Sequence, residues 1–464
     1  MKKGNREPQA AVSPARAAAF DILLRVERES SYATELLHSK TIASLTKVDH
    51  ALAIELVMGV LRWRSLLDLE ISKSSSQAIF KLDLEVLTAL RLAVYQLRGL
   101  SRIPARAAIH ESVELVKRAR KRSAAPFVNA VLRKIDGARP TSSEFDPLQI
   151  TGASVETLAI SSAHPLWLVE RWARAYGFEA AIQICRQDQS VPVTTIRLRH
   201  RDAEERLRGE GIELAPGALL GSARRVLHGD ITASAAFRSG WCVIQDEASQ
   251  LVAALVGQGA RVLDCCAAPG GKTLAIADRN VEAHIAAVDL HTHRARLLRR
   301  LLRGDDSFGK AGENRIGVVT ADARSLPFAA NFDRVLADVP CSGTGTLSRN
   351  PEIKWRLVPE DLADLQVRQL AILKSAMTQV SRGGRLVYST CSLEQEENED
   401  VIERALAEDS SFRVVACGDE LANLKEEGEL IWDETSALTR GPYLRTLPGV
   451  HPCDGFFSAI LEKS

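Results

Sequence analysis

Apolar residues in the first third of the chain recur at the spacing of amphipathic helices. The first of these faces lies behind Asp49, which we predict as a helix N-cap. Three faces share the i, i+3, i+4, i+7 pattern, and their positions are Ala53, Leu56, Val57, Val60 and Leu61, then Val86, Ala89, Leu90, Ala93, Val94 and Leu97, then Val128, Val131, Leu132 and Ile135. Because no strand-like alternation interrupts them, the pattern predicts an all-α bundle over residues 8–138.

A polar, proline-bearing stretch from Gly137 to about Ala163 breaks this periodicity and predicts a linker. Residues 160–235 then mix a helical segment with alternating, strand-like pieces, which indicates a small α/β module, RRM-like or ferredoxin-like. Its Trp167 and Trp172 offer rings for stacking on bases, but large aromatics at helical spacing more often pack in a core. We expect them to pack.

The last part of the chain, residues 236–464, alternates short apolar strands with helical segments. Such alternation predicts a doubly wound, Rossmann-like parallel sheet whose ligands bind at the carboxyl ends of the strands. The expected strands are Arg261 to Leu263, Ile285 to Val288, Ile316 to Thr320, Arg334 to Ala337 and Arg385 to Tyr388.

Charge is distributed unevenly along the chain. Residues 1–140 contain 24 Lys and Arg against 14 Asp and Glu, a net +10, whereas the remainder has 36 against 45, a net −9. A basic front domain suggests an anionic partner, and the run Lys117 to Arg122 is its densest part, although a charge run equally fits a solvated helix end.

The cysteine pattern and the hydropathy limit which classes of protein this chain can belong to. Eight cysteines lack paired spacing, so we expect reduced thiols in the cytoplasm and neither a disulfide framework nor a metal site. No stretch approaches the roughly 20 uninterrupted apolar residues of a membrane helix, so we expect no membrane association. Monomer is the default expectation.

Three strand ends carry groups suited to a nucleoside cofactor. The first strand is followed by a glycine turn, Cys266 to Thr273, which matches neither the dinucleotide nor the triphosphate motif. Asp289 follows the second strand, where a carboxylate accepts hydrogen bonds from ribose hydroxyls, and Asp322 follows the third. Each aspartate alone also fits a helix N-cap. Together they favour S-adenosylmethionine.

The fourth and fifth strands each end next to a cysteine, Cys341 and Cys391. Small buried thiols commonly only pack, but both of these sit in polar turns where a thiolate is plausible. Metal binding would need further ligands, and His291 and His293 follow a different strand without a matching pair. Cys265 lies within its strand and is expected in the core.

Several long motifs resemble, in order, those of the Nop2/Sun family of RNA cytosine-5 methyltransferases, and the front domain resembles the NusB-like RNA-binding fold. The catalytic motifs are QDEASQL, CCAAPGGKT, AVDLHTHR, TADARSLP, DRVLADVPCSGTGT, RNPEIKWR, GGRLVYSTCSLEQEENEDVI and DGFFSAIL, and the front motifs are VMGVLRWRSLLD, RLAVYQLRGLSRIPARAAIHESVELVKR and FVNAVLRKI. Bacterial members acting on small-subunit rRNA are the most similar.

The resemblance implies roles for individual residues. Cys391 would be the nucleophile that attacks cytosine, Cys341 would assist product release, and Asp338 would contact the target ring, where a protonated carboxyl would stabilise the charge made by thiolate addition. It also implies the residues that bind S-adenosylmethionine: Cys266, Ala267, Ala268, Pro269, Gly270, Gly271, Lys272, Asp289, Arg294, Asp322 and Asp338.

The implied substrate is small-subunit (16S) rRNA, naked or in an early assembly intermediate. Two alternatives stay open. The same chemistry fits tRNA, and a NusB-like front domain also fits a non-catalytic RNA-binding or antitermination factor.

Overall fold

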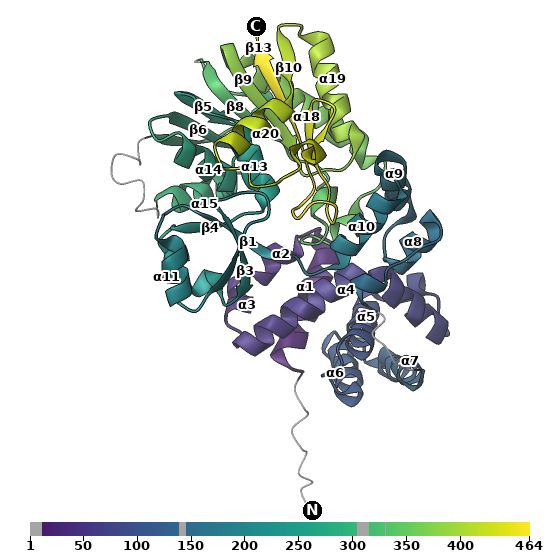
Figure 1. Cartoon of the computed structure of the whole chain (residues 1–464). Helices are drawn as coiled ribbons and strands as arrows, with labels where there is room; N and C mark the ends of the chain where they lie inside the picture. Colours follow the sequence, from purple (N-terminus) through teal and green to yellow (C-terminus); the bar gives the residue numbers. More distant parts are fainter. Residues whose placement is uncertain (1–11, 139–144, 304–314, 330) are drawn as a thin grey trace, which may run out of the picture. The chain divides into compact units, whose positions relative to one another are not determined.

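The computed structural model describes residues 12–138, 145–303, 315–329 and 331–464, and these form two compact units (Figure 1). The helical unit comprises the chain up to Val191 together with Leu347–Arg356. The sheet unit comprises Pro192–Thr346 and Leu357–Ser464. Residue 8, the predicted start of the front domain, lies outside the described residues, as do residues 139–144 of the predicted linker.

The helical unit confirms the predicted all-α front domain. Its longest helix, α4 (Lys47–Ser74), buries the face that begins at Ala53. The predicted cap Asp49 is wrong, because the hydroxyl of Thr46 accepts the Asp49 backbone N–H at 3.1 Å and thereby caps the helix. The other helices are α1 (Pro14–Glu29), α2 (Ala33–Leu37), α3 (Lys40–Ala43), α5 (Leu84–Gly99), α6 (Ala105–Arg118), α7 (Ala125–Gly137), α8 (Val155–Ser161), α9 (Leu166–Tyr176), α10 (Phe178–Gln189) and α17 (Ile353–Arg356).

Part of the predicted linker is helical. Helix α8 begins with a capping box in which Ser154 and Thr157 bond to each other's backbone N–H groups. Helices α9 and α10, which fall inside the predicted middle module, belong to the helical unit. Trp172 of α9 is buried and its ring meets His164 edge-on, which confirms core packing for this residue.

The helical unit contains one segment from far along the chain, Leu347–Arg356. Lys354 Nζ donates to the Arg62 carbonyl at 2.9 Å, and Trp355 Nε1 donates to the Leu61 carbonyl at 2.6 Å. The Arg62 guanidinium in turn donates to the Ser348 carbonyl at 3.0 Å. This segment begins six residues after Cys341 in the sequence.

Lys354 is fully buried, and burial lowers its pKa to about 7. Between about pH 7 and its ordinary pKa of 10.5, the unfolded chain therefore binds a proton that the folded unit lacks. The free energy of unfolding should rise with pH across this window, by up to about 1.4 kcal/mol per pH unit.

We expect Lys354→Met to remove this pH dependence, because methionine fills similar space without titrating. Denaturant unfolding of both proteins at pH 6 and pH 9 measures it. The methionine variant should gain stability relative to the parent at pH 6 and lose that gain at pH 9. Parallel pH curves would show that Lys354 stays charged in the folded unit.

The sheet unit begins with a small antiparallel sheet in the order β2-β3-β1-β4. Its elements follow one another as β-α-β-β-α-β, which is the ferredoxin-like arrangement expected for the middle module. They are β1 (Thr194–Leu198), α11 (Ala203–Gly209), β2 (Glu213–Pro216), β3 (Ala223–His228), α12 (Ala235–Arg238) and β4 (Cys242–Ile244).

The main sheet has nine strands in the order β11-β12-β13-β9-β8-β5-β6-β7, with β10 paired to β13. Strands β5 to β9 are parallel, and β13 runs antiparallel to β9. The strands are β5 (Arg261–Asp264), β6 (His284–Asp289), β7 (Ile316–Thr320), β8 (Phe332–Asp338), β9 (Val380–Thr390), β10 (Phe412–Val415), β11 (Thr439–Arg440), β12 (Tyr443–Thr446) and β13 (Phe456–Lys463). All five predicted strands are confirmed.

Helices cover both faces of this sheet (Figure 1), as a doubly wound fold requires. One core lies between the sheet and α13, α14 and α20, and the other lies beneath α18 and α19. These helices are α13 (Glu247–Leu255), α14 (Gly271–Arg279), α15 (Thr292–Arg303), α18 (Asp361–Thr378), α19 (Glu399–Glu408) and α20 (Cys417–Glu426). Across the described residues, no helix combines the length and apolarity needed to cross a bilayer.

Candidate active site

The strand order reverses at β5, because the chain continues to β6 and β7 on one side and returns to β8 and β9 on the other. Open α/β sheets bind ligands in the crevice at such a reversal, beyond the carboxyl ends of the strands. Here the turns after β5, β8 and β9 meet that edge, and they carry the glycine turn, Cys341 and Cys391.

The glycine turn joins β5 to α14. Gly270 has φ 117°, a left-handed conformation that side chains disfavour. A Cβ there would also lie 2.6 Å from Leu298 Cδ1, so only glycine fits. Because α14 starts at Gly271, its unpaired N–H groups and positive dipole end face the same crevice.

Asp264, at the end of β5, is a site residue that the sequence reasoning missed. It is buried, and burial raises its pKa to about 7, while the Thr273 hydroxyl donates to it at 2.7 Å. Its carboxyl ties β5 to the first turn of α14. The signal was present in the sequence, since an acid closed an otherwise apolar strand next to the glycines.

Asp289 and Asp322 both shape local turns. Asp289 Oδ1 accepts the His291 backbone N–H at 2.8 Å. The Asp322 carboxylate caps a short 3-10 helix and binds the Arg324 guanidinium, whose hydrogen bonds lower the Asp322 pKa. The N-cap interpretation therefore holds for Asp322. Asp289 Oδ2 has no hydrogen-bond partner among the described residues, so it can accept ribose hydroxyls.

The two strand-end cysteines come together. Cys341 Sγ lies 3.3 Å from Cys391 Sγ, and both thiols are only partly buried. The hydrogen bond to Cys391, reinforced by burial, raises the pKa of Cys341 well above its ordinary value. Cys341 therefore keeps its proton and can donate it toward the Cys391 sulfur.

A lysine and a carboxylate face this pair. Lys272 Nζ lies 2.8 Å from Asp338 Oδ2 and 5.0 Å from the centre of the Phe456 ring. Burial acts to lower the Lys272 pKa, but Asp338 and Cys391 outweigh it and the pKa is raised. Lys272 is thus charged, and it forms an ion pair with the Asp338 carboxyl.

A buried carboxylate joins the two cysteine turns. Glu397 is fully buried and accepts the Ser342 backbone N–H at 2.8 Å and the hydroxyls of Ser342 and Ser392. Gln369 Nε2 donates to it at 2.8 Å as well. Each serine directly follows a catalytic-candidate cysteine, so Glu397 fixes the two turns relative to each other. Sequence reasoning missed it because it lies in an acidic run typical of an exposed helix start.

Other predicted residues have plainer surroundings. Cys265 is buried as expected, whereas Arg294 is exposed on α15. Within the described ranges, no three His, Cys, Asp or Glu side chains are grouped to hold a metal ion.

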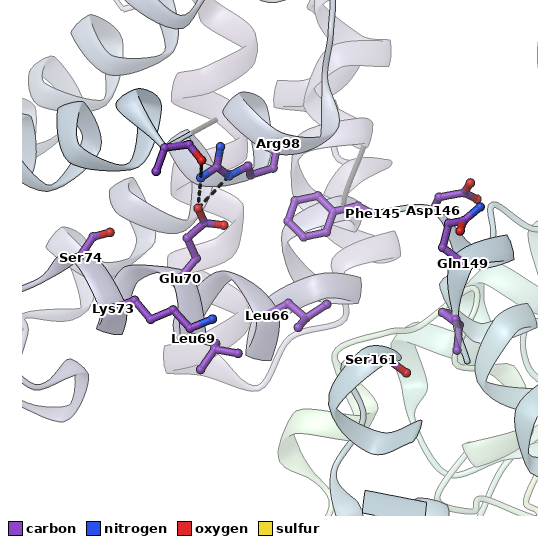
Figure 2. Close-up of a pocket in the computed structure, with 12 residues that line it drawn as sticks. Leu66, Leu69, Glu70, Lys73, Ser74, Arg98, Phe145, Asp146, Gln149 and Ser161 are labelled. Atoms are coloured by element: carbon purple, nitrogen blue, oxygen red, sulfur yellow. Dashed lines mark hydrogen bonds and ion pairs between the residues drawn. The ribbon is translucent and has the colours of Figure 1, made fainter. Parts of the chain in front are cut away.

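A separate pocket of about 500 Å³ lies in the helical unit (Figure 2). Arg98 there is bonded to Glu70 and to the Ala138 carbonyl. None of the predicted site residues lines this pocket, so we assign it no part in the site.

Comparison with known proteins matches two families to separate parts of the chain. Residues 253–462 match the family described as 16S rRNA methyltransferase RsmB/F, and residues 13–137 match the NusB family. The structure of NSun6 from Pyrococcus horikoshii has the same fold over 65% of this chain and 99% of its own, with a TM-score of 0.54 at 20% identity.

Relatives of similar length extend the match over both units. The probable ribosomal RNA small subunit methyltransferase B of Bacillus subtilis is 35% identical over 96% of this chain and 98% of its own length. The ribosomal RNA small subunit methyltransferase B of Vibrio vulnificus is 30% identical over 97% and 99%. The chain therefore belongs to the ribosomal RNA small subunit methyltransferase B family, a family of RNA methyltransferases.

Proposed function

We propose that this protein transfers a methyl group from S-adenosylmethionine to carbon 5 of a cytosine in small-subunit (16S) rRNA, through a covalent adduct with Cys391. The observation that carries the proposal is the pair of thiols 3.3 Å apart at the ends of neighbouring parallel strands. Family membership supports RNA methylation. The related NSun6 structure was solved with SFG, an analogue of S-adenosylmethionine, which supports the cofactor.

Carbon 5 of cytosine is too weak a nucleophile to accept a methyl group unaided, so a covalent step is needed. The Cys391 thiolate adds to carbon 6 and turns the ring into an enamine with a nucleophilic carbon 5. When bound, S-adenosylmethionine supplies the methyl group as an activated sulfonium. A base then removes the carbon 5 proton, and the bond between carbon 6 and sulfur breaks with its electron pair returning to Cys391.

The surroundings of Cys391 suit this chemistry. The Lys272 ammonium favours negative charge on the neighbouring sulfur, and Cys341 offers a thiol proton to it. Glu397 holds both turns, so the thiols are positioned before substrate arrives. A cytosine stacked in a duplex exposes neither face to a thiol, so the target is an unpaired or flipped nucleotide.

The types of residue at the crevice suit the chemical groups of S-adenosylmethionine. The Gly270 turn lets backbone approach a ligand, and the free Asp289 oxygen suits ribose hydroxyls. Residues 266–272, Asp289, Asp322 and Asp338 would hold the cofactor, with Arg294 supporting the turn after β6. Lys272 and Asp338 would lie at its charged end.

We expect Asp338→Asn to slow single-turnover methyl transfer by about 100-fold, the size of an electrostatic contact at the reacting atoms. The amide neither pairs with Lys272 nor helps keep it charged. Because Asp338 raises the Lys272 pKa, its loss should also shift the alkaline limb of the pH–rate profile to lower pH. An unchanged rate and profile would remove Asp338 from the chemistry.

Bisulfite sequencing of total RNA from a deletion strain tests the function. Loss of one cytosine signal in small-subunit rRNA, restored by the wild-type gene and not by Cys391→Ala, is the expected result. Loss of a tRNA signal would reassign the substrate. An unchanged methylation map would contradict the proposed activity and favour a non-catalytic, NusB-like RNA-binding role. A ribosomal substrate also implies that the reaction occurs in the cytoplasm.

A further inference from the structure

The basic run of the front domain is partly neutralised within its own unit. Three of its side chains pair with acids: Lys117 with Glu114 at 2.7 Å, Arg118 with Asp21 at 2.7 Å and Lys121 with Asp83 at 2.9 Å. Exposed pairs of this kind leave little net field for a polyanion. Pairing therefore leaves two exposed arginines of this run, Arg120 and Arg122, without an ion pair to a described residue.

Helix α15 presents a different balance. Thr292–Arg303 contains five arginines and His293 with no Asp or Glu, although the chain after residue 140 is net negative. Arg296 and Arg300 are exposed, one helical turn apart, and form no ion pair with any residue that the structure describes. Arg299 donates to the Val318 carbonyl at 2.9 Å, which leaves its charge uncompensated by that contact.

The opposite face of α15 fixes the helix beside the candidate active site. Leu298 is buried in a small core with Ala267 and Ala287, and it lies against Gly270 of the glycine turn. The helix also begins three residues after Asp289. Figure 1 shows α15 beside α14 in the sheet unit. A charged surface is thus carried by an element whose other side packs on the proposed cofactor turn.

We propose that the exposed stripe of α15 formed by His293, Arg296 and Arg300 binds the phosphate backbone of the substrate RNA. The inference rests on the proposed function for the identity of the polyanion. Guanidinium groups bind phosphates in a bidentate manner and stay charged at every working pH. Side chains at i and i+4 project together, so both arginines can contact neighbouring phosphates of one strand. Such contacts supply affinity and orientation without reading sequence.

The test is a double charge reversal, Arg296→Glu with Arg300→Glu, in the full-length protein. The matched control is Arg368→Glu with Arg404→Glu, two exposed arginines of α18 and α19 without ion pairs to described residues. The dissociation constant for a fluorescein-labelled fragment of small-subunit rRNA is measured by anisotropy over a salt series. S-adenosylmethionine affinity and the single-turnover rate at saturating RNA are measured in parallel.

We expect the α15 variant to bind RNA at least about 10-fold more weakly near 0.1 M salt, with a salt slope reduced by about 1.4, the value for two single-strand phosphate contacts. Cofactor affinity and the saturated rate should stay at wild-type values. Wild-type RNA affinity and slope in the α15 variant, or an equal loss in the control, would overturn the proposal. Binding to anionic lipid vesicles is measured as well. If the α15 variant lost vesicle binding and kept its affinity for RNA, the proposal would also be overturned. Failure of the proposed function would appear differently, as a wild-type protein that methylates no RNA.

Discussion

Replacing Cys391 by alanine is expected to abolish methyl transfer, with a fall of at least about 10⁴-fold, as for the loss of other enzymatic nucleophiles. Without the thiolate, carbon 5 of cytosine is never activated, and no neighbouring group takes over. Cys341 is 3.3 Å away, but its pKa is raised well above the ordinary value, so it is held as a thiol. Single-turnover transfer of labelled methyl groups to RNA measures the loss.

Binding of S-adenosylmethionine should survive this change, because Cys391 follows β9 while the glycine turn follows β5. Calorimetric titration with the cofactor separates the two effects. Cys242→Ala, which removes a buried thiol from the small antiparallel sheet, is the matched control and should retain transfer. Retained turnover in Cys391→Ala would transfer the nucleophile role to another residue.

The parallel sheet was predictable because its strands are short apolar runs between helices, and its site was predictable because ligands meet such sheets at strand ends. That rule alone brought Cys341 and Cys391 to the same edge, although 50 residues separate them. Their separation of 3.3 Å was beyond the sequence, since it depends on Glu397, a buried acid that periodicity assigns to solvent. Burial of a charge is decided by its partners, here two serines from different turns.

The position of Leu347–Arg356 was equally beyond the sequence. Its motif resembles part of a catalytic domain, yet its side chains are bonded to α4 of the helical unit. Nothing in local hydropathy marks Lys354 as buried, because lysine is among the residues least often found inside. The burial of this segment depends on hydrogen bonds to the carbonyls of Leu61 and Arg62, which lie far away in sequence.

The distribution of charge along the sequence was a poor predictor of where the exposed basic surface lies. The run from Lys117 to Arg122 stood out by density, but acids from α1 and from the start of α5 compensate it. Helix α15 stood out less, because its arginines are interspersed with leucines, of which Leu298 and Leu302 pack in the core. Net charge along a sequence therefore located the basic domain, whereas the free basic surface depends on pairing in three dimensions.

Replacing Cys341 by alanine is expected to trap the reaction after methyl transfer, as a covalent complex of protein and RNA. Release requires Cys391 to leave as a thiolate when the carbon 5 proton is removed. Cys341 Sγ lies 3.3 Å from that sulfur, so its S–H can stabilise the departing charge. In its absence the adduct should accumulate and migrate slowly on a denaturing gel, while multiple turnover falls by about 100-fold.

Two further variants make this result decisive. Cys341→Ser keeps a hydrogen-bond donor and should restore part of the turnover with less adduct. Cys341→Ala combined with Cys391→Ala should form no adduct, because the attacking sulfur is gone. Adduct in the double variant would identify another nucleophile, and wild-type turnover without adduct in Cys341→Ala would remove Cys341 from product release. The two thiols are adjacent in space, and we propose different roles for them: Cys391 forms the bond to cytosine, and the Cys341 thiol allows it to break.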